Sequence, residues 1–159
     1  MTKPEALIRK AGTGDLEAIG KLWCEFMDFH SARDPHFSRS EEGEKCFKEF
    51  IAKHAVSKDS CVLVAESGGE VVGYLLASLA KNPPVLKERD YGTISDLAVA
   101  GRCRRLDIGG KMYREALLWF AGRGVRRIEL RVAATNEVST AFWQKNGFTP
   151  YAVVLSKNI

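Results

Sequence analysis

The sequence of 159 residues predicts one domain of the α/β class, with helices layered on a mixed central sheet. Segments with apolar residues at helical spacing alternate with short runs of β-forming residues, which is the pattern of a layered domain. Residues 93–132 have the pattern strand, helix, strand, a crossover unit that is expected to be parallel and right-handed. The length allows one sizeable core and is too short for two ordinary domains, so residues 1–159 are expected to form a single domain.

The first half of the chain is expected to give a strand, two helices and a β-hairpin. Thr13-Gly14-Asp15 can start the first helix and Ser40 can cap the second, because Thr, Asp and Ser side chains accept hydrogen bonds from free helix N–H groups. Ser67-Gly68-Gly69 is a turn signal between two extended runs, which predicts an antiparallel pair. The expected elements are a strand at residues 6–10, a helix from residue 16, a loop at 30–39, a helix from Ser40, and strands at 61–66 and 71–79.

The second half is expected to alternate strands and helices. Pro83-Pro84 cannot continue a strand interior, because proline lacks the donor that the ladder needs, which favours a mobile connection. Glycines after residue 121 and the pair Asn146-Gly147 stop the two helices. The expected elements are a connection at residues 81–90, a strand at 93–99, a helix at 109–122, a strand at 127–132, a helix at 137–145 and a last strand at 148–155.

Bulk composition excludes several classes of protein. No run reaches the ~18 to 20 apolar residues of a membrane helix, and residues 1–5 lack the apolar core of a signal peptide, so a cytoplasmic protein without a membrane partner is expected. The four cysteines form no C-x-x-C pair, which predicts neither a metal site nor a disulfide framework. The net charge of +4 does not imply nucleic acid, and the basic cluster has neither interleaved aromatics nor a helix-turn-helix pattern.

The most informative segment is residues 97–111, where a strand leads through a basic loop and glycines into a helix. A helix N-terminus offers N–H groups without partners and a partial positive charge, and upstream arginines add charged donors. Arg102, Arg104 and Arg105, followed by Gly109-Gly110, therefore predict a site for an anion such as a pyrophosphate. Taken alone, the segment is also compatible with a solvated loop and an ordinary helix start.

This segment resembles motif A of the Gcn5-related N-acetyltransferases (GNAT), in which Arg or Gln is followed by two residues, Gly, any residue and Gly or Ala. Arg104, Asp107 and Gly109 occupy those positions, with Asp107 in place of the usual glycine. A carboxylate there would face the anion, unless its side chain caps the helix and points away.

Residues 136–148 resemble motif B of the same family. Asn136, Phe142 and Gly147-Phe148 match the motif, and Ser139 replaces the usual alanine. The opening strand, followed by Asp15, is also similar to that of the family. The resemblance thus covers nearly the whole chain and is strongest from residue 93 to residue 148.

The resemblance implies a sheet of about six to seven strands with about four helices, in which the fourth and fifth strands splay apart around acetyl-coenzyme A. It also implies a set of residues that hold this cofactor along the fourth strand, the loop, and motif B. They are Leu97, Ala98, Val99, Arg104, Arg105, Leu106, Asp107, Ile108, Gly109, Gly110, Lys111, Asn136, Ser139, Phe142 and Trp143.

Catalytic roles follow from the same resemblance. Asp96, on the strand that leads into the cleft, is the first candidate for the general base, although it could instead hold a loop or a cationic substrate. Glu129 is the second candidate, with a surface ion pair to Arg127 or Arg131 as its alternative. The backbone N–H near Val99 would bind the carbonyl oxygen. Trp143 stands where many members of the family place a tyrosine acid, and indole cannot donate that proton at neutral pH.

The acceptor is expected to be a primary amine of a small molecule or a protein. His30 and Asp34, in the early loop, could contact it, or could belong to a capped, solvated loop. Tyr91, Tyr113 and Tyr151 are candidate proton donors only by residue type. A non-catalytic sensor of acyl-coenzyme A is the alternative function, and a homodimer through the edge of the last strand is possible by analogy with the family.

Overall fold

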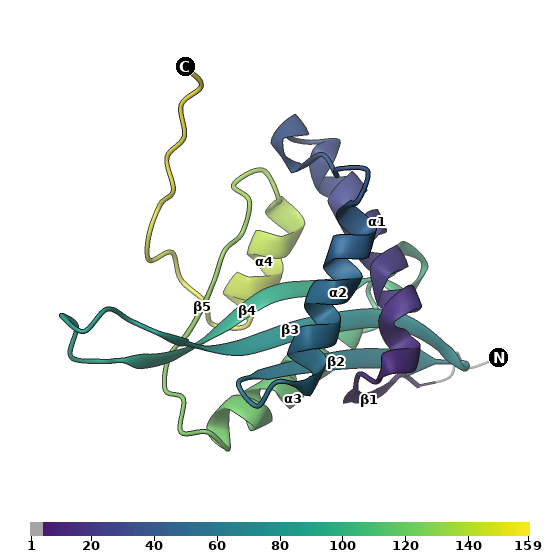
Figure 1. The fold of residues 1–159 in the computed structure, drawn as a ribbon, viewed down its shortest axis with the longest axis horizontal. Coiled ribbons are helices and arrows are strands. Elements are labelled where there is room, and N and C mark those ends of the chain that lie inside the picture. Colours follow the sequence, from purple (N-terminus) through teal and green to yellow (C-terminus); the bar gives the residue numbers. More distant parts are fainter. Residues whose placement is uncertain (1–4) are drawn as a thin grey trace.

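The computed structural model describes residues 5–159 and shows a five-stranded mixed sheet in that part of the chain (Figure 1). The strand order follows the sequence, from β1 to β5. Residues 1–4, on which part of the expectation about a signal peptide rests, lie outside the described residues. The strands are β1 (Leu7–Lys10), β2 (Ser60–Ser67), β3 (Glu70–Lys81), β4 (Asp90–Val99) and β5 (Ile128–Leu130).

Within residues 5–159, α-helices lie on both faces of the sheet. The first two pack on one face, where α1 contacts β3 and β4 and α2 contacts β2, and α3 covers the opposite face. The helices are α1 (Leu16–Ser31), α2 (Gly43–Val56), α3 (Ile108–Ala121) and α4 (Glu137–Lys145), with short 3-10 turns at Thr13–Asp15, Pro35–Phe37 and Gly101–Cys103. None of the helices in residues 5–159 has the length and apolarity needed to span a bilayer.

Alternation along the strands produces two cores, because successive side chains point to opposite faces of a sheet. In β2, Leu63 belongs to the core under α3, and Val62 and Val64 belong to the core under α1 and α2. Phe120 of α3 and Ile19 of α1 are almost completely buried at the centres of the two cores. The sheet is therefore covered on both faces, as the predicted α/β class requires.

The pairing of the strands agrees with the predicted topology. β2 and β3 are antiparallel, as are β3 and β4, and β4 and β5 are parallel through the crossover helix α3. The β3–β4 hairpin is longer than predicted, because Lys81 and Asp90 still pair and join in an ion pair of 2.7 Å. The Pro83-Pro84 segment therefore lies in the tip of the hairpin and interrupts no strand.

The prediction of a last strand at residues 148–155 is wrong. Residues 149–159 form no helix or strand and leave the body of the protein as an extended arm (Figure 1). The expected sheet of six to seven strands accordingly has five in the described chain. Residues 151–155 favour extended structure locally. A strand must also pair with a neighbouring strand, and these residues do not run along β5 or pair with it.

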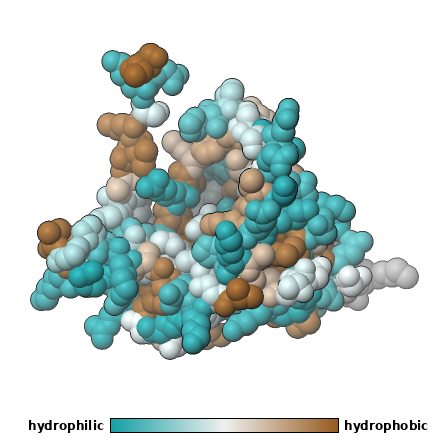
Figure 2. Space-filling view, viewed as in Figure 1, coloured by the Kyte–Doolittle hydropathy of each residue, from teal (hydrophilic) through white to brown (hydrophobic). Residues whose placement is uncertain are grey.

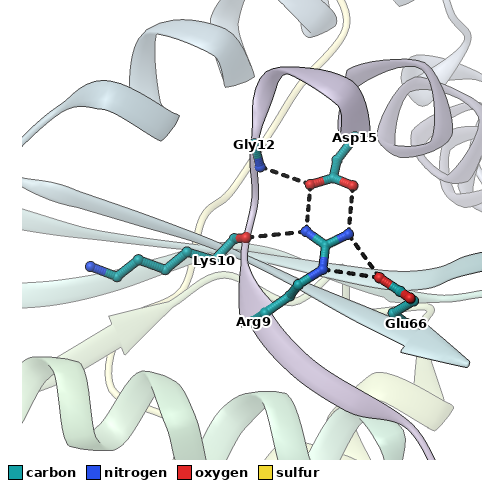
Figure 3. Close-up of polar contacts among 5 residues, drawn as sticks. All are labelled: Arg9, Lys10, Gly12, Asp15 and Glu66. Atoms are coloured by element: carbon teal, nitrogen blue, oxygen red, sulfur yellow. Dashed lines mark hydrogen bonds and ion pairs between the residues drawn. The ribbon is translucent and has the colours of Figure 1, made fainter.

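A charge cluster joins β1 to the start of α1 and to β2 (Figure 3). Both terminal nitrogens of Arg9 donate to Asp15, over 2.7 and 2.9 Å, and Arg9 Nε donates to Glu66 over 3.0 Å. The backbone N–H of Gly12 also donates to Asp15, over 2.7 Å. The Arg9 guanidinium holds the pKa of the buried Asp15 carboxyl below its usual value. This cluster satisfies a buried charge and fixes the turn between β1 and α1.

Candidate active site

The sheet is split between β4 and β5. Only Gly92, Thr93 and Ile94 of β4 pair with β5, whereas β4 itself continues to Val99. From residue 95 onward, the edge of β4 that faces β5 has no neighbouring strand in the described chain. The predicted splay of the fourth and fifth strands is therefore present, and it exposes backbone groups of β4.

The register shows which backbone groups of β4 face the split. Val99 is opposite Gly73, and the next residue, Ala100, donates its N–H to Val72 O over 2.8 Å. In an antiparallel ladder this makes Val99 and Gly73 a non-hydrogen-bonded pair, so Val99 turns its N–H and C=O away from β3. By the same alternation Leu97 also faces the split, and Ala98 bonds Tyr74 on β3. Val99 and Leu97 are thus free to bind a ligand through their backbones.

The loop before α3 concentrates backbone donors. Arg105 and Asp107 have left-handed backbone, with φ of 64° and 56°. Within the described chain, the N–H groups of residues 105–110 have no acceptor, and Lys111 is the first to donate, to Asp107 O over 3.0 Å. Successive free N–H groups in such a loop form a concave nest for an anion, and the helix N-terminus adds positive potential.

Asp107, which departs from the family motif, does not cap its helix. Its carboxylate accepts a hydrogen bond of 2.8 Å from Arg114, about two turns along α3, and no side-chain cap bond forms. The side chain lies over Gly110, where an added methyl group would clash with Asp107 Oδ1. The carboxylate is therefore drawn along the helix and neutralised by Arg114, and it leaves the N–H groups of the first turn uncapped.

The three loop arginines have different surroundings. Arg102 pairs with Glu70, whereas Arg104 and Arg105 have no acidic partner among residues 5–159. The Arg104 guanidinium lies 5.2 Å from the centre of the Phe29 ring of α1, and Glu25 of α1 accepts the Gly101 N–H over 2.7 Å. The end of α1 thus supports the loop and leaves two arginines available for an anion.

A second wall of the split comes from α4. A methyl group on Gly109 would lie 3.4 Å from Leu97 and 3.5 Å from Phe142, so β4, α3 and α4 converge at this point. Asn136 is buried and caps α4, because its Oδ1 accepts the Ser139 N–H over 3.0 Å. These residues shape the site and bring Phe142 beside the loop.

Four of the predicted cofactor residues direct their side chains elsewhere. Trp143 is buried against Tyr113 and Phe148, and Ile108 belongs to the core under α3. Lys111 forms an ion pair of 2.6 Å with Glu5, at the opposite edge of the sheet. Leu106 is exposed at the loop tip. The structure thus gathers the backbone of β4, the loop, Gly109-Gly110 and Phe142, and leaves these side chains outside the group.

Asp96 lies at an irregular point in the pairing of β4 with β3. A bulge in β4 places Ser95 out of register, so that Asp96 lies opposite Leu76 and Ile94 lies opposite Ala77. Asp96 is half-buried and has no hydrogen bond or ion pair to any described residue. Loss of water around the carboxylate raises its pKa from 3.8 to about 6. The group is therefore mostly ionised at neutral pH and has an increased affinity for a proton.

Tyr74 accompanies Asp96 on the same face of the sheet. Ala98 lies directly opposite Tyr74, so Asp96, two residues away on β4, is its diagonal neighbour. The Tyr74 hydroxyl is buried and has no hydrogen-bond partner in the described part of the chain. Burial, with a smaller effect of the Asp96 charge, raises the pKa of Tyr74.

The other predicted catalytic and acceptor residues already have partners. Glu129 accepts a hydrogen bond of 2.8 Å from Arg127, which is the surface pair foreseen as its alternative. His30 is buried against three phenylalanine rings, and burial lowers its pKa. Asp34 accepts the His36 N–H over 3.0 Å and caps a 3-10 turn. Of these four predicted side chains, Asp96 is the one with no hydrogen bond, ion pair or ring contact to another residue in the part of the chain that the structure describes.

The sequence interpretation did not single out Tyr74, Glu25 or Phe29. Each acts through a partner distant in sequence: Glu25 is 76 residues from Gly101, and Tyr74 faces β4 only through the strand register. No local pattern marks such residues, and only the register of β3 on β4 would have indicated Tyr74.

The fold and the loop define an α/β domain in which a split sheet edge lies beside an uncapped helix N-terminus. Comparison with known proteins gives this kind of domain a name. The family model described as the Acetyltransferase (GNAT) family matches residues 21–148. The chain belongs to this family.

Individual relatives are distant in sequence. An uncharacterized N-acetyltransferase of Bacillus subtilis, YhfO, is 23% identical over 141 residues, which cover 89% of this chain and 88% of the relative. An uncharacterized N-acetyltransferase of Archaeoglobus fulgidus is 27% identical over 136 residues, with coverage of 86% and 88%. Both names agree with the family.

Solved structures show the same fold. A tetramutant of the BH1408 protein from Bacillus halodurans has a TM-score of 0.87 at 22% identity, covering 96% of this chain and 99% of that one. An aminoglycoside N-acetyltransferase, AAC(6')-Iy, in complex with CoA, has a TM-score of 0.74 at 15% identity, with coverage of 99% and 97%.

Proposed function

We propose that this protein transfers an acetyl group from acetyl-coenzyme A to a primary amine, with Asp96 as the general base. The observation that carries the proposal is the combination of an unpaired, proton-binding carboxylate with a split sheet edge and an uncapped nest of backbone N–H groups. Membership of the acetyltransferase family supports the reaction class.

The loop residues fit the anionic part of coenzyme A. Residues 105–110 offer backbone donors without acceptors, and Arg104 and Arg105 offer charged donors without acidic partners among the described residues. Arg114 holds the one carboxylate that would oppose an anion there, Asp107. Phe142 and the backbones of Leu97 and Val99 would line the rest of the cofactor. Bound acetyl-coenzyme A would supply an activated thioester at this edge.

Asp96 has the properties of a base for an amine. An ammonium group must lose a proton before its nitrogen can attack, and a carboxylate with a pKa of about 6 accepts a proton more readily than an exposed aspartate. Its negative charge also favours a cationic acceptor at the same position. The Val99 N–H, turned toward the split, would donate to an acyl oxygen that gains negative charge.

We do not propose Tyr113 or Tyr151 as the proton donor for the departing thiolate. Tyr113 is buried in the core beside Trp143, and burial raises its pKa. Tyr151 lies on the C-terminal arm, where the centre of its ring is 4.3 Å from the guanidinium carbon of Arg127. We infer that the thiolate takes its proton from water.

Calorimetric titration of acetyl-coenzyme A tests the donor site. The Arg104→Ala/Arg105→Ala variant should bind at least ~100-fold more weakly than the wild type, because each charged hydrogen bond contributes about 1.5–3 kcal/mol. A matched control, Arg102→Ala/Arg126→Ala, removes the same charge from exposed positions outside the nest and should bind nearly as the wild type does. Equal weakening by both double variants would reduce the effect to net charge and overturn the site.

Thiol release with a panel of primary amines then tests the reaction. An enzyme releases coenzyme A faster when its acceptor is present, and the wild type should do so with at least one cationic amine. Tight binding without thiol release from any amine would favour the alternative, a non-catalytic sensor of acyl-coenzyme A. No binding to the wild type would remove both.

A further inference from the structure

The end of α1 brings two arginine side chains to one aromatic ring. The guanidinium carbon of Arg33 lies 3.6 Å from the centre of the Phe29 ring, and that of Arg104 lies 5.2 Å from the same centre. Among residues 5–159, Phe29 is the one ring that two guanidinium groups share. An aromatic face attracts a guanidinium group, whose planar fork of N–H donors remains suited to a phosphate or a carboxylate.

Exposure alone does not distinguish these two arginines, because hydrophilic side chains, in teal, spread over much of the face shown in Figure 2. Their partners are more informative. Arg39, farther along the same loop, pairs with Asp28 over 2.8 Å. Neither Arg33 nor Arg104 has an acidic partner in the described part of the chain. Two like charges beside one ring repel each other, so an anion bound to both would stabilise the pair.

Arg33 is fixed by the backbone of α1 as well as by the ring. Its Nη1 donates to the Phe29 carbonyl oxygen over 2.9 Å, at the C-terminal end of the helix, where carbonyl groups lack intrahelical donors. Such a bond is an ordinary role for an arginine after a helix, and it uses one of the five N–H donors. The other donors of Arg33 have no acceptor among residues 5–159. A side chain that is already held in place loses less entropy when it binds a ligand.

The carboxylates near this pair bind backbone groups. Glu25 of α1 accepts the Gly101 N–H over 2.7 Å, and Asp34 accepts a backbone N–H in the 3-10 turn that follows. His30, buried among aromatic rings, is mostly neutral at neutral pH, because burial and, to a smaller extent, the Arg33 charge lower its pKa. In the described chain, none of these three groups forms an ion pair with Arg33. The guanidinium fork of Arg33 therefore remains available to a ligand.

The arginine pair lies on the cofactor side of the site. Arg104 directly precedes the nest of residues 105–110, whose free N–H groups fit the anionic part of coenzyme A. A cation close to Asp96 would lower the pKa of that carboxyl. The pKa of Asp96 is instead raised by loss of water, and neither arginine contributes to the shift. Arg33 and Arg104 thus belong with the phosphates of the cofactor and not with the amine that Asp96 would deprotonate.

We propose that Arg33 and Arg104, aligned by Phe29, bind the 3′-phosphate of coenzyme A. Coenzyme A carries this group on the ribose next to its pyrophosphate, so a second anion site is expected beside the nest. A phosphate monoester has up to about two negative charges and three acceptor oxygens, which suit two guanidinium forks. Arg33 would thereby select coenzyme A over acyl donors that carry the same pantetheine arm without this phosphate. The inference rests on the proposed function, because it concerns the same cofactor.

Calorimetric titration of the wild type with coenzyme A and with dephospho-coenzyme A, which differs only by lacking the 3′-phosphate, tests this assignment. Coenzyme A should bind at least about 10-fold more tightly, because hydrogen bonds between charged groups are among the stronger ones in proteins. Arg33→Ala should reduce this preference to about 3-fold or less, by weakening coenzyme A and leaving dephospho-coenzyme A within about 2-fold. Arg39→Ala is the matched control: it removes the same charge from the same loop, at a residue paired with Asp28, and should keep the full preference.

The comparison on the wild type needs no variant, so it decides the matter even if Arg33→Ala fails to fold. Equal binding of the two forms by the wild type, or equal weakening of both by Arg33→Ala, overturns the assignment and leaves the proposed function in place. Unchanged binding of both forms by Arg33→Ala also overturns it, and a raised KM for the acceptor would then assign the arginine to an anionic acceptor. No binding of either form to the wild type would remove the proposed function as well.

Discussion

Asp15 and Asp96 are both removed from water at the sheet, but their environments are opposite. Asp15 accepts three hydrogen bonds, two from Arg9 and one from Gly12 (Figure 3), and its pKa is lowered. Asp96 has no partner in the described chain, and burial raises its pKa to about 6. One carboxylate stabilises the fold by being ionised, and the other is ionised at a cost to the fold.

The contrast indicates which of the two is available for chemistry. A carboxylate whose lone pairs are occupied by a guanidinium and a backbone N–H cannot take a proton without losing those bonds. A desolvated carboxylate without partners gains by taking a proton, as a general base does. The opposite consequences for stability and activity make the comparison testable.

The largest expected effect is on activity in Asp96→Asn. The amide cannot accept a proton from the amine, so turnover should fall about 10²- to 10⁴-fold near pH 7.5. The change should also raise the free energy of unfolding by about 1–2 kcal/mol, because it removes a charge that is partly desolvated in the folded protein. The gain is limited because the half-buried Asp96 carboxylate keeps part of its contact with water. Steady-state thiol release and urea unfolding measure the two quantities.

Asp90→Asn is the matched control for Asp96. Asp90 lies on the same strand, is exposed, and pairs with Lys81. Asp90→Asn should leave turnover unchanged, and it should change the free energy of unfolding by no more than about 0.5 kcal/mol. A fall in the turnover of Asp96→Asn together with a loss of stability would point to a structural role for Asp96 and contradict the assignment.

The next effect is on stability in Asp15→Asn. Removing the charge leaves Arg9 with Glu66 alone and replaces one acceptor oxygen by a donor, so the free energy of unfolding should fall by about 2–4 kcal/mol. Asp28→Asn breaks an exposed pair with Arg39, of 2.8 Å, and should cost no more than about 1 kcal/mol. Equal losses in urea unfolding would show that burial of the Asp15 pair contributes nothing.

The pH dependence of stability should have opposite signs at the two sites. Because the folded pKa of Asp96 is raised, its ionisation destabilises the fold as pH rises from about 4 to about 6, and the advantage of Asp96→Asn should vanish below about pH 4. The folded pKa of Asp15 is lowered, so its contribution is present above about pH 4 and is lost below it. Unfolding of the wild type and both variants at about pH 3, 5 and 7 measures these slopes.

The fold could largely be predicted from the sequence because its signals are local. The period of α3, the glycines after it and the cap of α4 at Asn136 depend on near neighbours, and the helix predicted at 137–145 is the observed one. The loop before α3 likewise carries its signal within one turn. The prediction of the last strand was wrong because a strand depends on pairing with another strand that is distant in sequence. Residues 149–159 pair with none in the described chain.

The candidate site was only partly predictable for the same reason. Asp96 could be selected from its position on a strand before the loop, but its lack of a partner depends on the bulge at Ser95 and on β3 beside it. Glu129 was the second candidate base and His30 a candidate acceptor contact, and the structure gives Glu129 an ion-pair partner and His30 an enclosing cluster of aromatic rings. Residue type proposes a base, and the three-dimensional environment determines whether it is free.

Tyr74→Phe gives the smallest effect and concerns the hydroxyl beside Asp96. A buried hydroxyl without a partner costs free energy, and phenylalanine keeps the ring packing against Phe47, so the variant should be more stable by about 0.5–1 kcal/mol. Tyr91→Phe, at a half-buried position on β4, should change unfolding by less than about 0.5 kcal/mol. One hydrogen bond contributes about 1 kcal/mol to stability. If Tyr74→Phe lowered the free energy of unfolding by that amount or more, the hydroxyl would have a partner such as a buried water. Asp96 would then share a polar network, and its contrast with Asp15 would be one of degree.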